Sequence, residues 1–216
     1  MSDRTRIKRG AERGVYQREV IEQIIDSTLI CHVCYVQNAE PRIIPTAVVR
    51  IDDHVYLHGN RRSAMIQALQ EGALASVCFT QVDGLVVARS GFHCSMNYRS
   101  VVLYGRATPV GDTCPEDKVA AMDALVEGLI PGHAAAVRVP TPQEIDATTV
   151  LRIPIEEASA KVRQGDPVDT ESDLNLDIWA GVIPLQTCTG TPVDAKDLRD
   201  GIEQPEYIAR FQRRVQ

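Results

Sequence analysis

Short runs of apolar and β-branched residues, separated by turn-forming residues, are the feature that most limits how this chain can fold. Such runs lie at 28–37, 42–51, 54–58, 73–81, 85–90, 100–110, 149–155, 158–163 and 178–185. Strands this close along a chain favour antiparallel hairpins, here with turns at 38–41 and at Asp83-Gly84. The pattern predicts a mainly β protein, a closed or split barrel, in one domain over 1–216.

Helical signals stand between some of these runs. They lie at 19–26, from Ser63 to Gln70, from Pro115 to about Leu129, and at the capping-box pair Thr141 and Glu144. We therefore expect a β-barrel with peripheral helices. Gly105, inside the run 100–110, suggests a β-bulge.

Charge and hydropathy set bounds on the partners. The formal net charge is −6, and a nucleic-acid-binding face is basic, so we expect no nucleic-acid partner. The exception is a basic arm at 1–15, which is either a solvated tail or a segment that packs on a partner subunit. The tail at 187–216 is expected to be peripheral. Membrane-length apolar runs and a signal-peptide core are both missing, which predicts a cytoplasmic protein with no membrane partner.

Two of the six cysteines, Cys31 and Cys34, have C-x-x-C spacing inside a predicted strand. Side chains three residues apart on a strand point to opposite faces, whereas a zinc or redox site needs both sulfurs to converge. We therefore interpret these cysteines as small buried hydrophobic residues. His93-Cys94 lacks a third ligand in suitable spacing, and no metal is expected.

The segment His58-Gly59-Asn60-Arg61-Arg62-Ser63 has the composition of an anion cradle. It joins a strand end, a glycine and the start of a helix, and two guanidinium groups lie beside them. A phosphate is bound by free N–H groups at a helix N-terminus, by close backbone approach and by arginine. The spacing alone leaves a charged surface turn equally open.

The second polar segment runs from Arg89 to Ser100 and is dense in hydrogen-bonding side chains. It is either a satisfied polar loop or a pocket wall that contacts a cofactor or substrate. His32 alternates within a strand and is interpreted as structural.

Four segments in order resemble the pyridoxamine 5′-phosphate oxidase-like family, and within it the flavin-nucleotide-binding proteins that include the nitroimidazole-resistance (Nim) reductases. The first three segments are Arg42-Ile43-Ile44-Pro45-Thr46-Ala47, Leu57 to Ala64 and Ser95 to Val101. The fourth begins with Trp179-Ala180-Gly181. The resemblance implies an FMN-binding split barrel and a homodimer with FMN at the subunit interface. The residues that it places at the cofactor are Ile44, Pro45, Thr46, Ala47, His58, Gly59, Asn60, Arg62, Ser63, Asn97, Arg99, Ser100 and Trp179.

The roles implied are specific. Residues 44–47 would line the flavin ring with backbone groups, and His58, Arg62 and Ser63 would meet the ribityl chain and phosphate. The family's oxidases have a substrate-binding lysine where this chain has Ala47, and their C-terminal Arg-x-His-type motif is not evident after Trp179. A typical vitamin B6 oxidase activity is therefore not expected.

These features support an FMN-dependent oxidoreductase that reduces a small organic acceptor, with nitro compounds as one example. His58 is the candidate catalytic residue, although a simple hydrogen bond to the cofactor or to a backbone carbonyl is the favoured interpretation. The alternative is a non-catalytic protein that stores or carries flavin or haem on the same barrel, with His58 or His93 as iron ligands. Haem and F420 are the alternative cofactors, and a plain structural protein is a third hypothesis.

Overall fold

The computed structural model of the chain describes residues 2–112, 114–211 and 214–215, and antiparallel strands dominate it. The strands are β1 (Gly14–Val15), β2 (Ile30–Gln37), β3 (Glu40–Ala47), β4 (Val49–Ile51), β5 (His54–Asn60), β6 (Leu74–Val87), β7 (Ser95–Arg106), β8 (Thr108–Pro109), β9 (Thr148–Pro154), β10 (Glu157–Arg163), β11 (Gly181–Pro184), β12 (Thr187–Cys188) and β13 (Arg214–Val215). The α-helices are α1 (Arg18–Ser27), α2 (Ala64–Gln70), α3 (Pro115–Leu129), α4 (Pro142–Ala147) and α5 (Glu206–Ala209). Short 3₁₀ turns lie at Ala11–Arg13, Ala134–Ala136 and Glu171–Asn175. The predicted mainly β fold with peripheral helices is confirmed.

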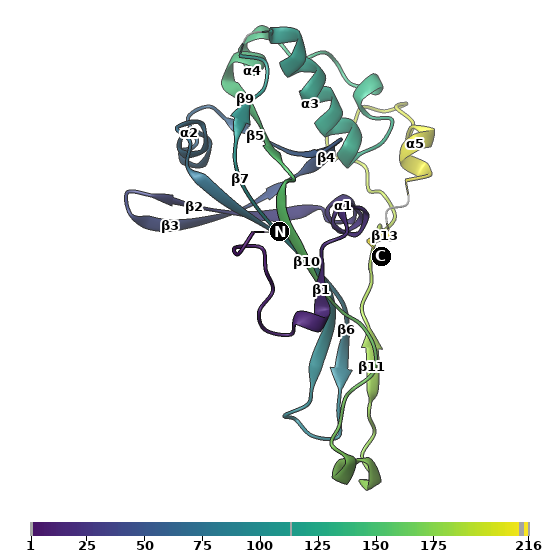
Figure 1. Cartoon of the computed structure of the whole chain (residues 1–216). Helices are drawn as coiled ribbons and strands as arrows, with labels where there is room; N and C mark the ends of the chain where they lie inside the picture. The colour runs from purple at the N-terminus through teal and green to yellow at the C-terminus, as the bar shows by residue number, and fades with distance from the viewer. Residues whose placement is uncertain (1, 113, 212–213, 216) are drawn as a thin grey trace.

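Two sheets enclose the core. The larger follows the order β1-β10-β7-β6-β2-β3, with β11 also paired to β6, and the smaller follows β4-β5-β9-β8. Figure 1 shows α2, α3 and α4 around the smaller sheet, while β2–β3 projects to one side and β6, β7 and β11 project downward as a long arm. The barrel is thus a compact lobe from which two hairpins extend.

The inward faces of the strands make the core as the alternating pattern requires. On β2, Cys31, Val33 and Tyr35 are buried, and they cluster with Phe79 of β6 and Ile66 of α2. Burial raises the pKa of the Cys31 thiol to about 12, so this sulfur stays a neutral thiol. Cys34 lies on the opposite face of the same strand, as its spacing predicts, but it is partly exposed, so the prediction of a buried residue is right for Cys31 and wrong for Cys34.

Three local predictions were wrong. The pair Asp83-Gly84 is not a hairpin turn: β6 runs through it unbroken, and the register shift between Val82 and Gly84 places the bulge there. The predicted strand 42–51 is two strands, β3 and β4, which belong to different sheets. Gly105 is not the bulge but a packing position, since a Cβ on it would lie 2.5 Å from Ile153 Cγ2.

The predicted starts of three helices are confirmed. Ser63 is the N-cap residue of α2, Pro115 stands in the first turn of α3, and Thr141 with Glu144 forms a complete capping box at α4. These signals depend on contacts within one turn, so the sequence alone determines them.

The basic arm contacts its own chain. Arg4 pairs with Glu157 of β10 at 3.2 Å and lies over the ring of Tyr104 of β7, and Lys161 Nζ donates to the carbonyl of Arg9 at 3.0 Å. The arm therefore lies along β10 and β7, beside β1 in Figure 1, rather than extending into solvent as a tail.

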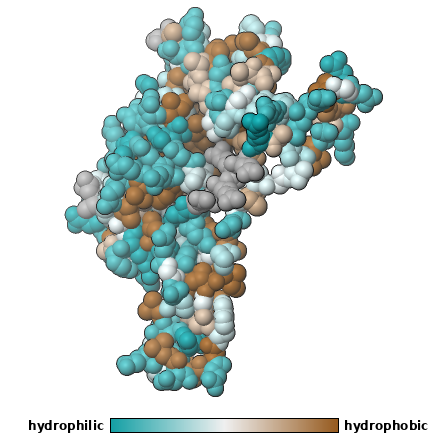
Figure 2. Space-filling view, turned by 90° about the vertical axis from the view of Figure 1, so that its right-hand side faces the viewer, coloured by the Kyte–Doolittle hydropathy of each residue, from teal (hydrophilic) through white to brown (hydrophobic). Residues whose placement is uncertain are grey.

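The chain exposes more surface than its mass requires. Its accessible surface is 13774 Å², whereas a compact monomer of 23.8 kDa exposes about 9,900 Å². Apolar side chains contribute to the excess on both projections, and Figure 2 shows them gathered on the lower arm. They include Ile30, Val36 and Ile43 on β2–β3, and Phe92, Met96, Trp179 and Ile183 on the lower arm. In the described part of the chain, no helix combines the length and apolar character needed to cross a membrane.

Packing at Gly105 gives a first prediction. We expect Gly105→Ala to destabilise the fold by about 1–3 kcal/mol, because the new methyl group overlaps Ile153 in a filled core. Gly91→Ala is the matched control, since nothing lies within 4 Å of a Cβ at Gly91. Denaturant unfolding of the two variants measures the difference, and equal stabilities would show that the β7–β9 contact yields at no cost.

Candidate functional site

A break in the pairing of β6 creates the main cleft. On one edge, β6 pairs with β2 as far as Cys78 and pairs with β11 from Gly84 onward. Residues 79–83 therefore have no strand partner on that edge, although β7 continues along the other and the N–H of Leu185 donates to the carbonyl of Asp83 at 3.0 Å. An unpaired stretch within a sheet leaves backbone donors and acceptors available to a ligand.

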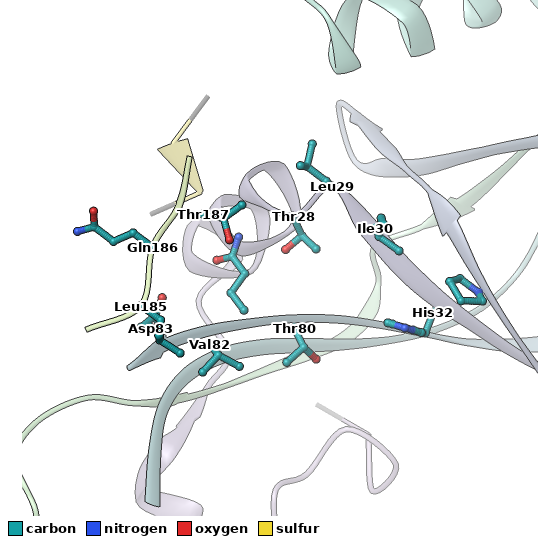
Figure 3. Close-up of a pocket in the computed structure, with 12 residues that line it drawn as sticks. Thr28, Leu29, Ile30, His32, Thr80, Val82, Asp83, Leu185, Gln186 and Thr187 are labelled. Atoms are coloured by element: carbon teal, nitrogen blue, oxygen red, sulfur yellow. The ribbon is translucent and has the colours of Figure 1, made fainter. Parts of the chain in front are cut away.

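The cleft at this break has a volume of about 580 Å³, within the usual range for small-molecule sites. Figure 3 shows its four sides: Thr28 and Leu29, the β2 residues Ile30 and His32, the β6 residues from Thr80 to Asp83, and the segment from Leu185 to Thr187. Pro45 of β3 also lines it. Apolar walls over a polar strand edge suit a planar heteroaromatic group.

Strand β3 forms the free edge of the sheet beside this cleft. Its register with β2 sets which side each residue faces, because directly opposed residues share a face. Pro45 lies opposite His32 and so faces the cleft, whereas Ile44 and Thr46 lie opposite Val33 and Cys31. The second face is the one that α2 covers. The predicted ring-lining residues 44–47 therefore face two different sides of the sheet.

The predicted phosphate segment lies on the α2 side. Its backbone is largely occupied: the N–H of Arg61 donates to Ala147 O, that of Arg62 to Asn60 Oδ1, and that of Ser63 to Asn60 O. The Arg61 guanidinium pairs with Asp146 at 3.2 Å. Available donors are the side chains of Arg62, which has no partner among the described residues, and of Ser63, which caps no helix N–H.

Gly59 has a different role from the one expected. The sequence suggested a glycine that lets the backbone approach a phosphate. In the structure its backbone has no unusual φ, and a Cβ on it would lie 3.0 Å from Ile66 Cγ1. Gly59 thus allows α2 to pack closely on β5. His58 precedes it, exposed and opposite Val150 of β9.

The three predicted residues on β7 are all engaged within the chain. Arg99 forms two hydrogen bonds with the carboxylate of Asp83, at 2.7 and 3.0 Å. Ser100 Oγ donates to Lys161 O, and Asn97 Nδ2 donates to Gly165 O. Arg99 therefore holds Asp83 at the cleft, which gives this wall a fixed carboxylate.

Trp179 is two-thirds exposed and lies against Gly181, where a Cβ would be 2.9 Å from the indole ring. The Trp-Ala-Gly motif thus lets the indole fold onto the start of β11. Within one subunit, Trp179 and β7 do not meet β3: three strand spacings, about 14 Å, separate β3 from β7. The predicted site residues consequently form separate groups in a single chain.

The five histidines divide into two sets. His54 hydrogen-bonds Asp53 at 2.6 Å and His133 hydrogen-bonds Tyr207 at 2.8 Å. The rings of His32, His58 and His93 have no hydrogen-bond partner in the described residues. His32 lines the cleft, a position that its alternation within a strand did not indicate. Within the described residues, no three His, Cys, Asp or Glu side chains gather as a metal site.

Comparison with known proteins identifies the family. Residues 17–162, well over half of the chain, match the model of a family described as pyridoxamine 5′-phosphate oxidase. The chain belongs to the pyridoxamine 5′-phosphate oxidase family. The predicted resemblance is confirmed, and the mainly β, antiparallel fold matches the split barrels of this family.

Two solved structures match over nearly the whole chain. The flavocytochrome Anf3 from Azotobacter vinelandii is 37% identical, covers 97% of each chain and has a TM-score of 0.91. The FAD and haem binding protein from Mycobacterium smegmatis is 33% identical, covers 94% of this chain and 98% of its own, and has a TM-score of 0.89.

A more distant match shares the fold alone. The structure of a candidate 5-nitroimidazole antibiotic resistance protein from Bacteroides thetaiotaomicron is 20% identical, covers 69% of this chain and 86% of its own, and has a TM-score of 0.58. No curated protein matches the chain.

Proposed function

We propose that this chain is a homodimeric redox protein that binds a flavin nucleotide and a haem. The observation that carries the proposal is the near full-length match to two structures named for a flavin and a haem together, at 37% and 33% identity. One of those names specifies FAD, so we propose FAD in place of the FMN expected from the sequence.

The α2 side of β3 suits the flavin. A free strand edge offers backbone donors and acceptors to the polar rim of a flavin ring, and Ile44 and Thr46 supply side-chain contacts on that side. Arg62 and Ser63 offer the unused donors for a phosphate. The residues present therefore fit a flavin phosphate through side chains more than through the backbone.

The cleft at residues 79–83 suits the haem. Leu29, Ile30 and Leu185 give it apolar walls, and His32 supplies an imidazole without a competing hydrogen bond. Neutral imidazole is a common axial ligand of haem iron. His58 and His93 remain alternative ligands outside this cleft.

The homodimer accounts for the surface. Large permanent interfaces bury about 1,000–2,500 Å² on each partner, so the excess of about 3,900 Å² per chain is more than enough for one. A second copy on the outer face of the large sheet would cover Val36 and Ile43, and it would bring another β7 close to β3. The groups that stay apart in one chain would then share a site.

Bound flavin supplies hydride and one-electron chemistry, and haem supplies one-electron chemistry. The protein contributes position and polarity. Arg99 fixes the Asp83 carboxylate, and the segment from Leu185 to Thr187 forms one side of the cleft. We propose an oxidoreductase that passes electrons to a small organic acceptor.

For the flavin site, we expect Arg62→Ala to weaken flavin binding about tenfold, or about 1.4 kcal/mol, through loss of one charge-assisted contact. Arg61→Ala is the control, because Asp146 already holds its guanidinium. Titration of flavin into apo-protein gives both dissociation constants. Wild-type protein that shows no flavin absorbance and gains no thermal stability from added FAD would end the proposal.

For the haem site, we expect added haemin to give a Soret band that His32→Ala removes. His54→Ala should leave the band unchanged, because Asp53 engages His54 away from the cleft. Loss of the band in His58→Ala or His93→Ala instead would place the haem elsewhere. A protein that takes up flavin but no haemin would reduce the proposal to a simple flavoprotein.

For the homodimer, sedimentation should give about 48 kDa, twice the 23.8 kDa of the chain. We expect Ile43→Glu to raise the dissociation constant of the dimer, since it places a charge on the outer sheet face. Val193→Glu, at a more exposed apolar position in the C-terminal tail, is the control. A wild-type monomer that retains flavin would contradict a shared site.

A further inference from the structure

Arg163 at the end of β10 is a buried cation without an anion. The residue is only 8% exposed, and its hydrogen bonds go to Asn97 Oδ1, Gly165 O and Asp166 O, all neutral acceptors. A guanidinium carries five N–H donors, so two are left over. A buried charge is costly unless an opposite charge compensates it.

Other shielded arginines in the chain are compensated. Arg50, Arg89 and Arg99 have side chains 22%, 26% and 19% exposed, and each contacts a carboxylate at 2.6 to 2.9 Å. Arg163 is more buried than any of these and contacts none. Three shielded arginines are thus each paired with a carboxylate, and Arg163 is the exception.

The surroundings of Arg163 are also positive. Lys161 lies two residues earlier, on the same face of β10, and its Nζ binds only the carbonyl of Arg9. Neither Arg163 nor Lys161 has a carboxylate within ion-pair distance among the described residues, although Asp166 follows three residues after Arg163 and the net charge of the chain is −6. Two neighbouring cations on one strand are therefore left without an anionic partner.

We propose that Arg163 and Lys161 form an anion subsite that takes the phosphate groups of the bound flavin nucleotide. This deepens the proposed function and rests on it. Arg163 touches Asn97, and Lys161 is paired with Ser100 of β7. These two β7 residues are among those for which the family resemblance implies a role at a cofactor shared between subunits. The Arg62 segment is the first anchor, and this subsite is a second one suited to the diphosphate of a dinucleotide.

The test compares three flavins that differ in phosphate number: FAD, FMN and riboflavin. Each is titrated into apo-protein of the wild type, Arg163→Gln, Lys161→Gln and the control Arg138→Gln, whose guanidinium is exposed and paired with Glu144. We expect Arg163→Gln and Lys161→Gln to raise the dissociation constant of FAD about tenfold and that of riboflavin less than about twofold. Arg138→Gln should change neither constant.

An unchanged FAD affinity would overturn the proposal, as would an equal loss for FAD and riboflavin, which marks a purely structural role. If Arg163→Gln does not fold, Lys161→Gln decides alone, because its side chain makes a single hydrogen bond. Inorganic pyrophosphate separates this proposal from the flavin proposal: it should raise the melting temperature of wild-type apo-protein and not that of Lys161→Gln. No rise in the wild type overturns the subsite, whereas a rise without any flavin binding overturns only the proposed function.

Discussion

The pairing of β6 with β7 is the constraint on which the rest of the structure depends. These strands share a ladder from Leu74↔Arg106 to Val86↔Ser95, which is long enough to belong to the barrel at one end and to the projecting arm at the other. The opposite edge of β6 is divided between β2 and β11. Because β7 pairs with β6 along the whole break, residues 79–83 can lack a strand partner on the other edge without local unfolding. The cleft exists because the edge of β6 that faces β7 is paired throughout, whereas the opposite edge is not.

The bulge at Val82 and Gly84 fits the same arrangement. A bulge adds twist to a strand, and here it falls between the segment paired with β2 and the one paired with β11. A Cβ on Gly84 would lie 3.0 Å from Ile183 O, so glycine also permits β11 to approach. Asp83 between them projects to the cleft, where Arg99 fixes it. The bulge thus underlies both the local backbone geometry and the position of a carboxylate at the cleft.

Features that depend on local contacts can be predicted from the sequence, and those that depend on distant contacts cannot. The cap at Thr141 and the first-turn position of Pro115 are decided within one turn, and the strands follow from alternation. Asp83-Gly84 looks like a hairpin turn because that dipeptide favours one, but twelve paired positions between β6 and β7 override the preference. In the sequence, Gly105 and Gly59 suggest a special backbone conformation or a close backbone approach. In the structure, each glycine makes room for a side chain distant in the sequence, Ile153 at Gly105 and Ile66 at Gly59. A residue pattern contains no information on such partners.

In the candidate site, too, the sequence predicts local features but not the contacts between distant residues. The four family segments could be recognised in order, but the carboxylate partner of Arg99 and the cleft position of His32 depend on strand register. Charge compensation is also non-local: Arg99 and Arg163 stand on neighbouring strands, and only the first meets an acid. An arginine bound to its own aspartate has little capacity left for a ligand, whereas one held by neutral acceptors keeps its full charge. Of the two, the residue that the sequence did not single out is therefore the better anion ligand.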